Sequence, residues 1–287
     1  MLGAIEAGGT KFVCAVANDD LKIVKEIELP TTHPEETFQK AFEFFDDYEL
    51  SAIGIGSFGP IDIDETSDTY GYITSTPKPN WGNTDFVGPF KERYQIPVGW
   101  NTDVNAAALG EYELGADETV KNLIYLTVGT GVGGGAVVDG EILGSKQHPE
   151  MGHLLIRPAA DDTYEGFCPY HRNCLEGMAA GPSIEKRLGT KAQDLPKDHP
   201  IWDTIADYLA QACLNYTMTL RPEQIILGGG VMKQTQLFPL IHAKFADYLN
   251  DYLETAELST YIRPPYLDGQ SGIKGSLLLA KNALENQ

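Results

Sequence analysis

The sequence predicts an α/β protein built from two similar halves. Each half opens with a strand, a glycine-rich turn and a returning strand, first within residues 2–17 and again within residues 122–138. Helical and strand patterns then alternate in both halves, which is typical of an α/β fold. The 287 residues, 42% of them hydrophobic, suffice for a large core, and this length favours two domains over one.

In the first half, short apolar segments bounded by turn residues predict strands at 2–5, 11–17, 21–29, 51–57 and 98–100. Apolar residues at helical spacing predict helices at 34–48, 86–94 and 104–112. Thr32 followed by Glu35 indicates a capping box at the start of the first helix. Residues 60–83, rich in Pro, Thr and Gly, predict a loop or hairpin region.

The second half repeats the pattern at greater length. Strands are expected at 122–128, 136–138, 224–227 and 260–263. Helices are expected at 183–188, 202–220, 236–253 and 273–282.

Charge and composition exclude several classes of partner. The net charge is −20, from 21 basic and 41 acidic residues, so the surface repels phosphate backbones and anionic lipids. We therefore expect no nucleic acid and no membrane among the partners. The start has no signal-peptide pattern, and four Cys in so long a chain do not make a disulfide framework. These features favour the cytoplasm, with Cys14 and Cys213 as small buried hydrophobes.

Four residues suggest a metal site, namely His153, Cys168, His171 and Cys174. Two thiolates and two imidazoles suit a closed tetrahedral Zn²⁺ site, and a metal would order a segment rich in Gly and Pro. Glu150 lies three residues before His153, so a group able to hold a polar substrate adjoins this cluster. The alternative is a loop that merely contains His and Cys.

Three glycine-rich turns follow predicted strands and suggest phosphate binding. They contain Gly8, Gly9 and Thr10, then Gly129, Thr130 and Gly131, and finally Gly228, Gly229 and Gly230. Glycines let backbone N–H groups approach an anion. The alternative for each turn is a tight hairpin that needs Gly without any ligand. The chain lacks a P-loop, and its G-x-G-G run enters a strand, which argues against a dinucleotide fold.

Other polar residues adjoin these turns. Lys11 could pair with a phosphate, or could be a solvated strand residue. Glu6 could hold Mg²⁺ through water, or could bond to turn amides. Asp103 follows a strand and opens a helix, where it could be a general base or simply the N-cap. Gly59-Pro60 and the segment from Thr76 to Trp81 could wall the same cleft, although Trp81 could instead be a packing residue.

The motifs together resemble those of the ROK family of sugar kinases and repressors. They are Gly8-Gly9-Thr10-Lys11, Asp103-Val104-Asn105-Ala106-Ala107-Ala108-Leu109-Gly110-Glu111, Gly129-Thr130-Gly131-Val132-Gly133-Gly134-Gly135 and Glu150-x-Gly152-His153. The Thr76-Pro77-Lys78 segment and Cys168-Pro169-x-His171-x-x-Cys174 are most similar to the bacterial fructokinases of that family.

The resemblance implies a two-lobed actin-like, ribonuclease H-like fold with ATP·Mg²⁺ in the cleft, a homodimer and a structural zinc. We expect an N-terminal lobe at 1–113 and a C-terminal lobe at 114–270 with the zinc loop at 153–174. The helix within 271–287 is expected to pack back on the N-terminal lobe. Two positions depart from the family pattern: Glu6 stands where many members carry Asp, and Thr102 where many glucokinases have Asn.

The resemblance further implies an ATP-dependent fructokinase. Asp103 would accept the proton of the sugar hydroxyl. Phosphates would be held by Gly8 to Lys11 and Gly129 to Gly131, with Gly228 to Gly230 beside adenosine. Sugar contacts are expected from Gly59, Pro60, Thr76, Thr102, Asp103, Glu150 and His153. A glucokinase or mannokinase of the family, and a non-catalytic sugar sensor on the same scaffold, remain alternatives, while an actin-like ATPase without sugar is disfavoured.

Overall fold

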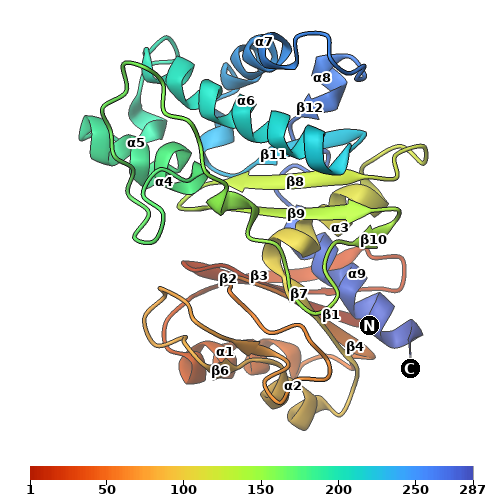
Figure 1. Ribbon diagram of the computed structural model, residues 1–287. Coiled ribbons are helices and arrows are strands. Elements are labelled where there is room, and N and C mark those ends of the chain that lie inside the picture. Colours follow the sequence, from red (N-terminus) through yellow and green to blue (C-terminus); the bar gives the residue numbers. More distant parts are fainter. Residues whose placement is uncertain (287) are drawn as a thin grey trace. The chain divides into compact units, whose positions relative to one another are not determined.

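A computed structural model describes residues 1–286 and divides them into two compact units (Figure 1). The first unit comprises Met1–Gly115, Ile142–Pro149 and the segment from Gln270 to the C-terminus. The second unit comprises Ala116–Glu141 and Glu150–Gly269. The chain thus leaves the first unit after Gly115 and returns to it for residues 142–149. It then re-enters the second unit and returns to the first unit from Gln270 onward.

Both units contain a five-stranded sheet with the same strand order. In the first unit the order is β3-β2-β1-β4-β7, from β1 (Leu2–Ala7), β2 (Lys11–Ala17), β3 (Ile23–Pro30), β4 (Ala52–Ser57) and β7 (Val98–Thr102). In the second it is β10-β9-β8-β11-β12, from β8 (Leu123–Val128), β9 (Val132–Val138), β10 (Glu141–Ile142), β11 (Gln224–Gly228) and β12 (Ile262–Arg263). Each sheet opens with an antiparallel hairpin and adds its last two strands in parallel. The predicted repetition is confirmed.

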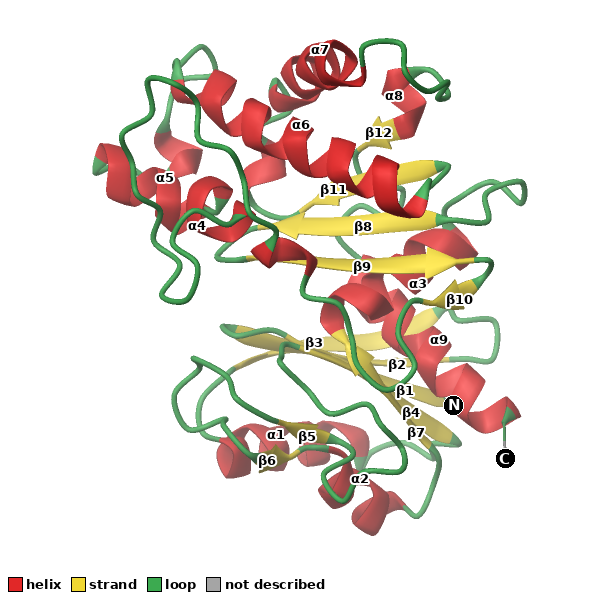
Figure 2. Ribbon diagram, viewed as in Figure 1, coloured by secondary structure: helices red, strands yellow, loops and turns green. Residues whose placement is uncertain are grey.

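One face of the first sheet carries an aromatic core. Helices α1 (Pro34–Phe45) and α2 (Val87–Tyr94) cover it, together with the small hairpin of β5 (Tyr72–Ile73) and β6 (Thr84–Asp85) (Figure 2). Its fully buried rings are those of Phe12, Phe45, Trp81, Phe86 and Phe90. Several of these rings contact one another, as Phe12 does with Trp81 at 5.4 Å between centroids. Each such side chain stabilises the unit by about 1.5–3 kcal/mol through burial.

The opposite face is lined by small residues and lies against α3 (Asp103–Leu114) and α9 (Ser271–Glu285). A Cβ at Gly54 would lie 1.8 Å from the carbonyl oxygen of Ser276, and one at Gly275 would lie 1.7 Å from that of Ala106. Backbones meet directly here, which only glycine permits. Because this contact fixes α9 on the sheet, it also fixes where the helix begins.

In the second unit, α6 (Ile201–Leu220) runs along one face of the sheet, and α7 (Leu237–Leu249) packs on α6 (Figure 1). The shorter helices are α4 (Leu175–Ala179), α5 (Gly181–Leu188) and α8 (Leu258–Tyr261), with single 3₁₀ turns η1 (Met151–His153), η2 (Ala192–Asp194) and η3 (Val231–Lys233). Within residues 1–286, no helix combines the length and apolar character that a membrane span needs.

Some predicted helix ends are wrong. Helix α1 begins at Pro34 with His33 at its N-cap, and the Thr32 hydroxyl donates to Glu36 at 2.8 Å, so the expected capping box does not form. Helix α7 stops at Leu249 because Asn250 adopts a left-handed conformation, with φ of 46°. The first half of the strand expected at 260–263 belongs to α8 instead, which leaves Ile262–Arg263 extended.

Candidate active site and metal cluster

Three predicted site segments leave the first sheet at the same edge. Ala7 at the end of β1 lies beside Ser57 at the end of β4, and Ser57 lies beside Thr102 at the end of β7. The N–H of Phe58 donates to the Ala7 carbonyl at 2.9 Å. The turn from Gly8 to Thr10, the Gly59-Pro60 turn and Asp103 therefore all follow strands that end together, where ligands of α/β folds bind.

Thr102, and not Asp103, caps helix α3. Its Oγ1 accepts a hydrogen bond from the Asn105 N–H at 3.1 Å, and the side chain is 4% exposed. Asp103 is the first helical residue and is half-buried, and its Oδ1 accepts from the Val104 N–H at 2.9 Å. The alternative reading of Asp103 as the N-cap is therefore wrong. The expected contact of Thr102 with sugar stays a prediction.

The carboxyl group of Glu6 lies at the N-terminus of α9. A Cβ at Gly272 would lie 2.4 Å from the Glu6 Cδ, and the Ile273 N–H bonds to the carboxylate. Burial, followed by the negative charge of Asp103, raises the pKa of Glu6 to about 7, while the positive charge of Lys11 acts in the opposite direction. A divalent cation beside these two carboxylates would relieve both the burial and the repulsion, so the pair fits Mg²⁺. The alternative expectation, that Glu6 bonds to turn amides, is corrected in one respect: the amide that bonds to the carboxylate is that of Ile273 in helix α9.

The first glycine-rich turn is held in place by Thr31, the residue that follows β3. The Thr31 hydroxyl donates to the Gly8 carbonyl at 2.7 Å, and the Thr31 N–H donates to the Thr10 carbonyl at 3.0 Å. Gly9 and Thr10 are exposed. Lys11 is exposed and forms an ion pair with Glu28 on the neighbouring strand. The Lys11 side chain thus lies on the surface in contact with a carboxylate. Its binding of phosphate stays a prediction.

His148 supports the Gly59-Pro60 turn, although the sequence pattern did not single it out. Its Nε2 accepts a hydrogen bond from the Ile61 N–H at 3.1 Å. Its ring atoms would lie 3.7–3.8 Å from a Cβ at Gly59. Thr76, by contrast, uses its hydroxyl oxygen to accept from the Lys78 N–H at 3.2 Å. Trp81 is fully buried and donates to the Thr32 carbonyl at 2.7 Å, so it is a packing residue.

The second and third glycine turns meet within the second unit. The Gly181 N–H donates to the Gly129 carbonyl at 2.8 Å, and a Cβ at Gly129 would lie 3.9 Å from the Gly230 nitrogen. Gly229 has φ of +91° and packs against the backbone of Val128. Thr130 and Gly230 are exposed. Exposed or half-buried backbone from both turns is therefore gathered in one place, as a nucleotide site requires.

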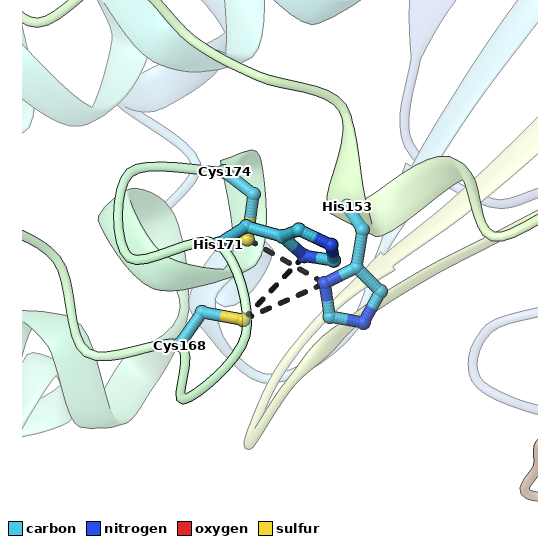
Figure 3. A group of neighbouring side chains, drawn as sticks. All are labelled: His153, Cys168, His171 and Cys174. Atoms are coloured by element: carbon cyan, nitrogen blue, oxygen red, sulfur yellow. Dashed lines mark hydrogen bonds between the residues drawn. The ribbon is translucent and has the colours of Figure 1, made fainter.

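The four expected metal ligands come together in the second unit (Figure 3). His153 is in η1. Cys168 and His171 lie in the loop before α4, and Cys174 is the N-cap residue of that helix. One ligand atom from each lies within 4.8 Å of the others. His153 Nδ1 is 3.7 Å from Cys168 Sγ and 3.5 Å from Cys174 Sγ.

These separations match a tetrahedral ion. Typical Zn–S and Zn–N bonds at a tetrahedral angle place sulfur and nitrogen about 3.6 Å apart. Burial raises the pKa of the Cys174 thiol to about 11, so a cation is needed to stabilise its thiolate at neutral pH. The predicted cluster is therefore confirmed as a group that could hold zinc. Cys14 and Cys213 are buried thiols, as expected.

The turn η1 joins this cluster to the second glycine-rich turn. A Cβ at Gly152 would lie 1.7 Å from the Val132 carbonyl oxygen, and the Tyr216 hydroxyl donates to the Met151 carbonyl at 2.6 Å. His153 turns Nδ1 toward the two sulfurs, which leaves Nε2 on the other side of the ring (Figure 3). Glu150 and His153 are thus held close to the start of β9.

The sequence profile of the ROK family matches residues 2–283. The chain belongs to the ROK family. This ROK protein is 50% identical over 286 residues to a fructokinase of Pediococcus pentosaceus, covering 100% of this chain and 99% of that protein. It is 47% identical to a fructokinase of Streptococcus mutans, covering 98% and 97%. Among solved structures, the ROK hexokinase of Thermus thermophilus matches with a TM-score of 0.82 at 26% identity, covering 100% of this chain and 99% of that one. The actin-like fold of ROK sugar kinases is thereby confirmed.

Proposed function

We propose that this protein is an ATP-dependent fructokinase that converts D-fructose to D-fructose 6-phosphate. Full-length identity of 47–50% to proteins named fructokinase supports the substrate. The observation that carries the chemistry is the division of roles between Thr102 and Asp103. Thr102 caps the helix, so the Asp103 carboxylate stands at the sheet edge without serving as the N-cap.

Asp103 acts as the general base. It accepts the proton of the attacking sugar hydroxyl as the oxygen bonds to the γ-phosphorus and the bond to the leaving ADP oxygen breaks. Phosphoryl transfer needs little covalent help from the protein, so positioning and charge neutralisation dominate the rate.

We assign phosphate binding to the glycine-rich turns of both units, with Gly228 buried at the end of β11. In the first unit these residues are Gly8, Gly9, Thr10 and Lys11. In the second they are Gly129, Thr130 and Gly131, with Gly228, Gly229 and Gly230 holding the nucleoside end. The gathering of Gly129, Gly181 and Gly230 supports this assignment.

Sugar binding is assigned to polar and turn residues of each unit. They are Gly59, Pro60, Thr76, Thr102 and Asp103 in the first unit, and Glu150 and His153 in the second. His153 would bind the metal through Nδ1 and the sugar through Nε2.

Two metals fit the residues present. Mg²⁺ would be held near Glu6 and Asp103 and would neutralise phosphate charge. Zn²⁺ would be held by His153, Cys168, His171 and Cys174 and would order their loop. The donor set of two thiols and two imidazoles supports zinc over harder cations.

The family resemblance also supports a homodimer. The free thiols and the use of ATP support a cytoplasmic location.

The test is ADP release by the purified protein with ATP, Mg²⁺ and a panel of fructose, glucose and mannose. We expect turnover with the highest kcat/KM for fructose. A preference for glucose or mannose would replace the substrate, and sugar binding without ADP release would identify a sensor.

A further inference from the structure

His148 lies in a short segment, residues 142–149, that belongs to the first unit while the chain on both sides of it belongs to the second. Its imidazole is half-buried, and its Nε2 accepts a hydrogen bond from the Ile61 N–H at 3.1 Å. A ring nitrogen that accepts a hydrogen bond carries no proton, so the neutral ring carries its proton on Nδ1. His148 is thus bonded to the amide that directly follows the Gly59-Pro60 turn.

Other hydrogen bonds hold this turn on both sides of Gly59. Before it, the Phe58 N–H donates to the carbonyl of the last residue of β1 at 2.9 Å. After it, the Pro60 carbonyl accepts from the N–H of Thr74 at 2.8 Å and from its hydroxyl at 3.0 Å. Within residues 1–286, the N–H and the carbonyl of Gly59 itself form no hydrogen bond with the protein. The turn is therefore fixed around a glycine whose own polar groups are available to a ligand.

The imidazole of His148 also bounds the space beside this glycine. A Cβ at Gly59 would lie 3.7 Å from Cε1 and 3.8 Å from Nε2 of His148, and 3.2 Å from the Ile61 nitrogen. Ile61 is 6% exposed, so its N–H would have little access to water if the imidazole were removed. The ring and the amide that it holds thus lie against the same side of Gly59.

We propose that His148 is a positioning residue for the sugar. Its bond to the Ile61 N–H fixes the peptide groups beside Gly59, so the polar groups of Gly59 are held in place before a sugar hydroxyl arrives. A site that is ordered in advance loses less conformational freedom on binding and binds more tightly. The inference rests on the proposed function, since it takes Gly59 to contact the sugar. It adds a residue that the assigned sugar contacts do not include.

Three substitutions separate the hydrogen bond of His148 from the bulk of its ring. His148→Gln can place its side-chain oxygen close to the position of Nε2, and so keeps an acceptor for the Ile61 N–H. His148→Phe keeps a planar ring without an acceptor, and His148→Ala removes both. A poorly solvated N–H without its partner carries a free-energy cost that corresponds to about a tenfold change in affinity when binding must restore the order.

The experiment is calorimetric titration of the full-length protein with fructose, and separately with a non-hydrolysable ATP analogue and Mg²⁺. His148→Phe and His148→Ala should raise the fructose Kd about tenfold and leave the analogue Kd nearly unchanged. His148→Gln should regain most of the lost fructose affinity. In steady-state assays the fructose KM should rise by a larger factor than kcat falls, because His148 acts on binding and not on proton transfer.

Lys146→Ala is the matched control. Lys146 lies in the same segment, is 66% exposed and pairs with Asp64 at 3.2 Å, and neither residue belongs to the turn. The variant should bind fructose as wild type does. A loss equal to that of His148→Ala would show that the segment as a whole, and not His148, orders the turn, and would overturn the inference.

The remaining outcomes are equally decisive. Wild-type fructose affinity in His148→Phe would overturn the inference, as would equal losses of fructose and analogue affinity, which would indicate general damage to the fold. His148→Gln binding no better than His148→Phe would show that the bond to Ile61 is not responsible. A wild-type protein that releases no ADP with any hexose would contradict the proposed function itself, which keeps the two failures distinct.

Discussion

At the residue scale, Thr102 caps helix α3, a task that the Asp103 side chain could also perform, and this leaves the Asp103 carboxylate for its proposed role as general base. Thr102 Oγ1 satisfies the Asn105 N–H, and Asp103 takes the next position. Both residue types are good N-caps, so the sequence could not decide which one caps the helix. The structure decides it by placing Thr102 in extended backbone, with φ of −67° and ψ of 153°.

Asp103→Asn should therefore retain the fold and lose turnover. Asn cannot accept the proton, and loss of a general base typically lowers kcat by about 10²–10⁴. Thermal unfolding and fructose binding should stay close to wild type because Thr102 still caps α3. Thr102→Ala is the contrasting variant and should cost about 1 kcal/mol of stability. A near-normal kcat for Asp103→Asn would remove Asp103 from the catalytic role.

Glu6 should make stability depend on pH. The pKa of Glu6 is raised by burial from its ordinary value of 4.5 to about 7 in the folded protein, so the folded state binds more protons between these values. Its contribution to stability is therefore fully present below about pH 4.5 and is lost as pH rises through about 7. Glu6→Gln removes this titration. Without divalent cations, the Tm of the variant should exceed that of wild type increasingly from pH 5 to 8, and parallel curves would contradict the assignment.

Residue roles could be predicted from sequence where the partners are close along the chain. Cys168, His171 and Cys174 are three residues apart, and their spacing alone indicated a metal. The sequence pattern did not indicate His148 or Glu176, because their hydrogen-bond partners, Ile61 and Val132, lie 87 and 44 residues away in the sequence. Neither contact leaves a local pattern.

At the element scale, the hydrophobic pattern gave the long helices and the paired strands but not the short elements. Helix α4 has five residues, too few for a helical period to be seen. The strand predicted at 260–263 is wrong in its first half, because residues 260–261 end α8 and only residues 262–263 form β12. Both elements pack against α7 and β11, and these distant contacts decide the conformation of the segment. The aromatic core and the small-residue face of the first sheet follow from the alternation of side chains along its strands.

The contact of α9 with α3 makes a direct test of close packing. Gly275→Ala would place a Cβ 1.7 Å from the Ala106 carbonyl oxygen, so the helices must separate. We expect a loss of about 1–3 kcal/mol or more in the free energy of unfolding, measured by denaturant titration. Gly82→Ala is the matched control, since its Cβ would have ordinary contact at 3.6 Å. Equal stability of the two variants would show that α9 does not approach α3 this closely.

At the scale of the whole molecule, the metal cluster should connect stability with ligand binding. Cys174→Ser replaces a thiolate ligand, and three-ligand sites hold structural zinc poorly. The variant should contain less zinc, unfold at lower temperature and bind fructose more weakly, because His153 and Glu150 share one short turn. Elemental analysis of the purified wild type is the decisive control, and absence of zinc there would refute the assignment.

Metal uptake should also release protons. Burial raises the pKa of the Cys174 thiol to about 11, so at neutral pH the metal must displace a proton from it. Zinc affinity should therefore rise with pH, as a competition assay with a chromogenic chelator between pH 6 and 8 would measure. Affinity that does not change with pH would argue against thiolate ligation.

The path of the chain has a consequence for its synthesis. Helix α9 belongs to the first unit but follows the whole second unit in the sequence, so it leaves the ribosome after that unit. Until then, the glycine and alanine face of the first sheet, including Gly54 and Ala52, has no α9 to cover it. In a nascent chain, the first unit therefore lacks α9 while the second unit is being synthesised. Premature termination before α9 would therefore damage the first sheet, although the missing residues lie far from its strands in the sequence. Chaperones and proteases would be expected to recognise such truncated chains.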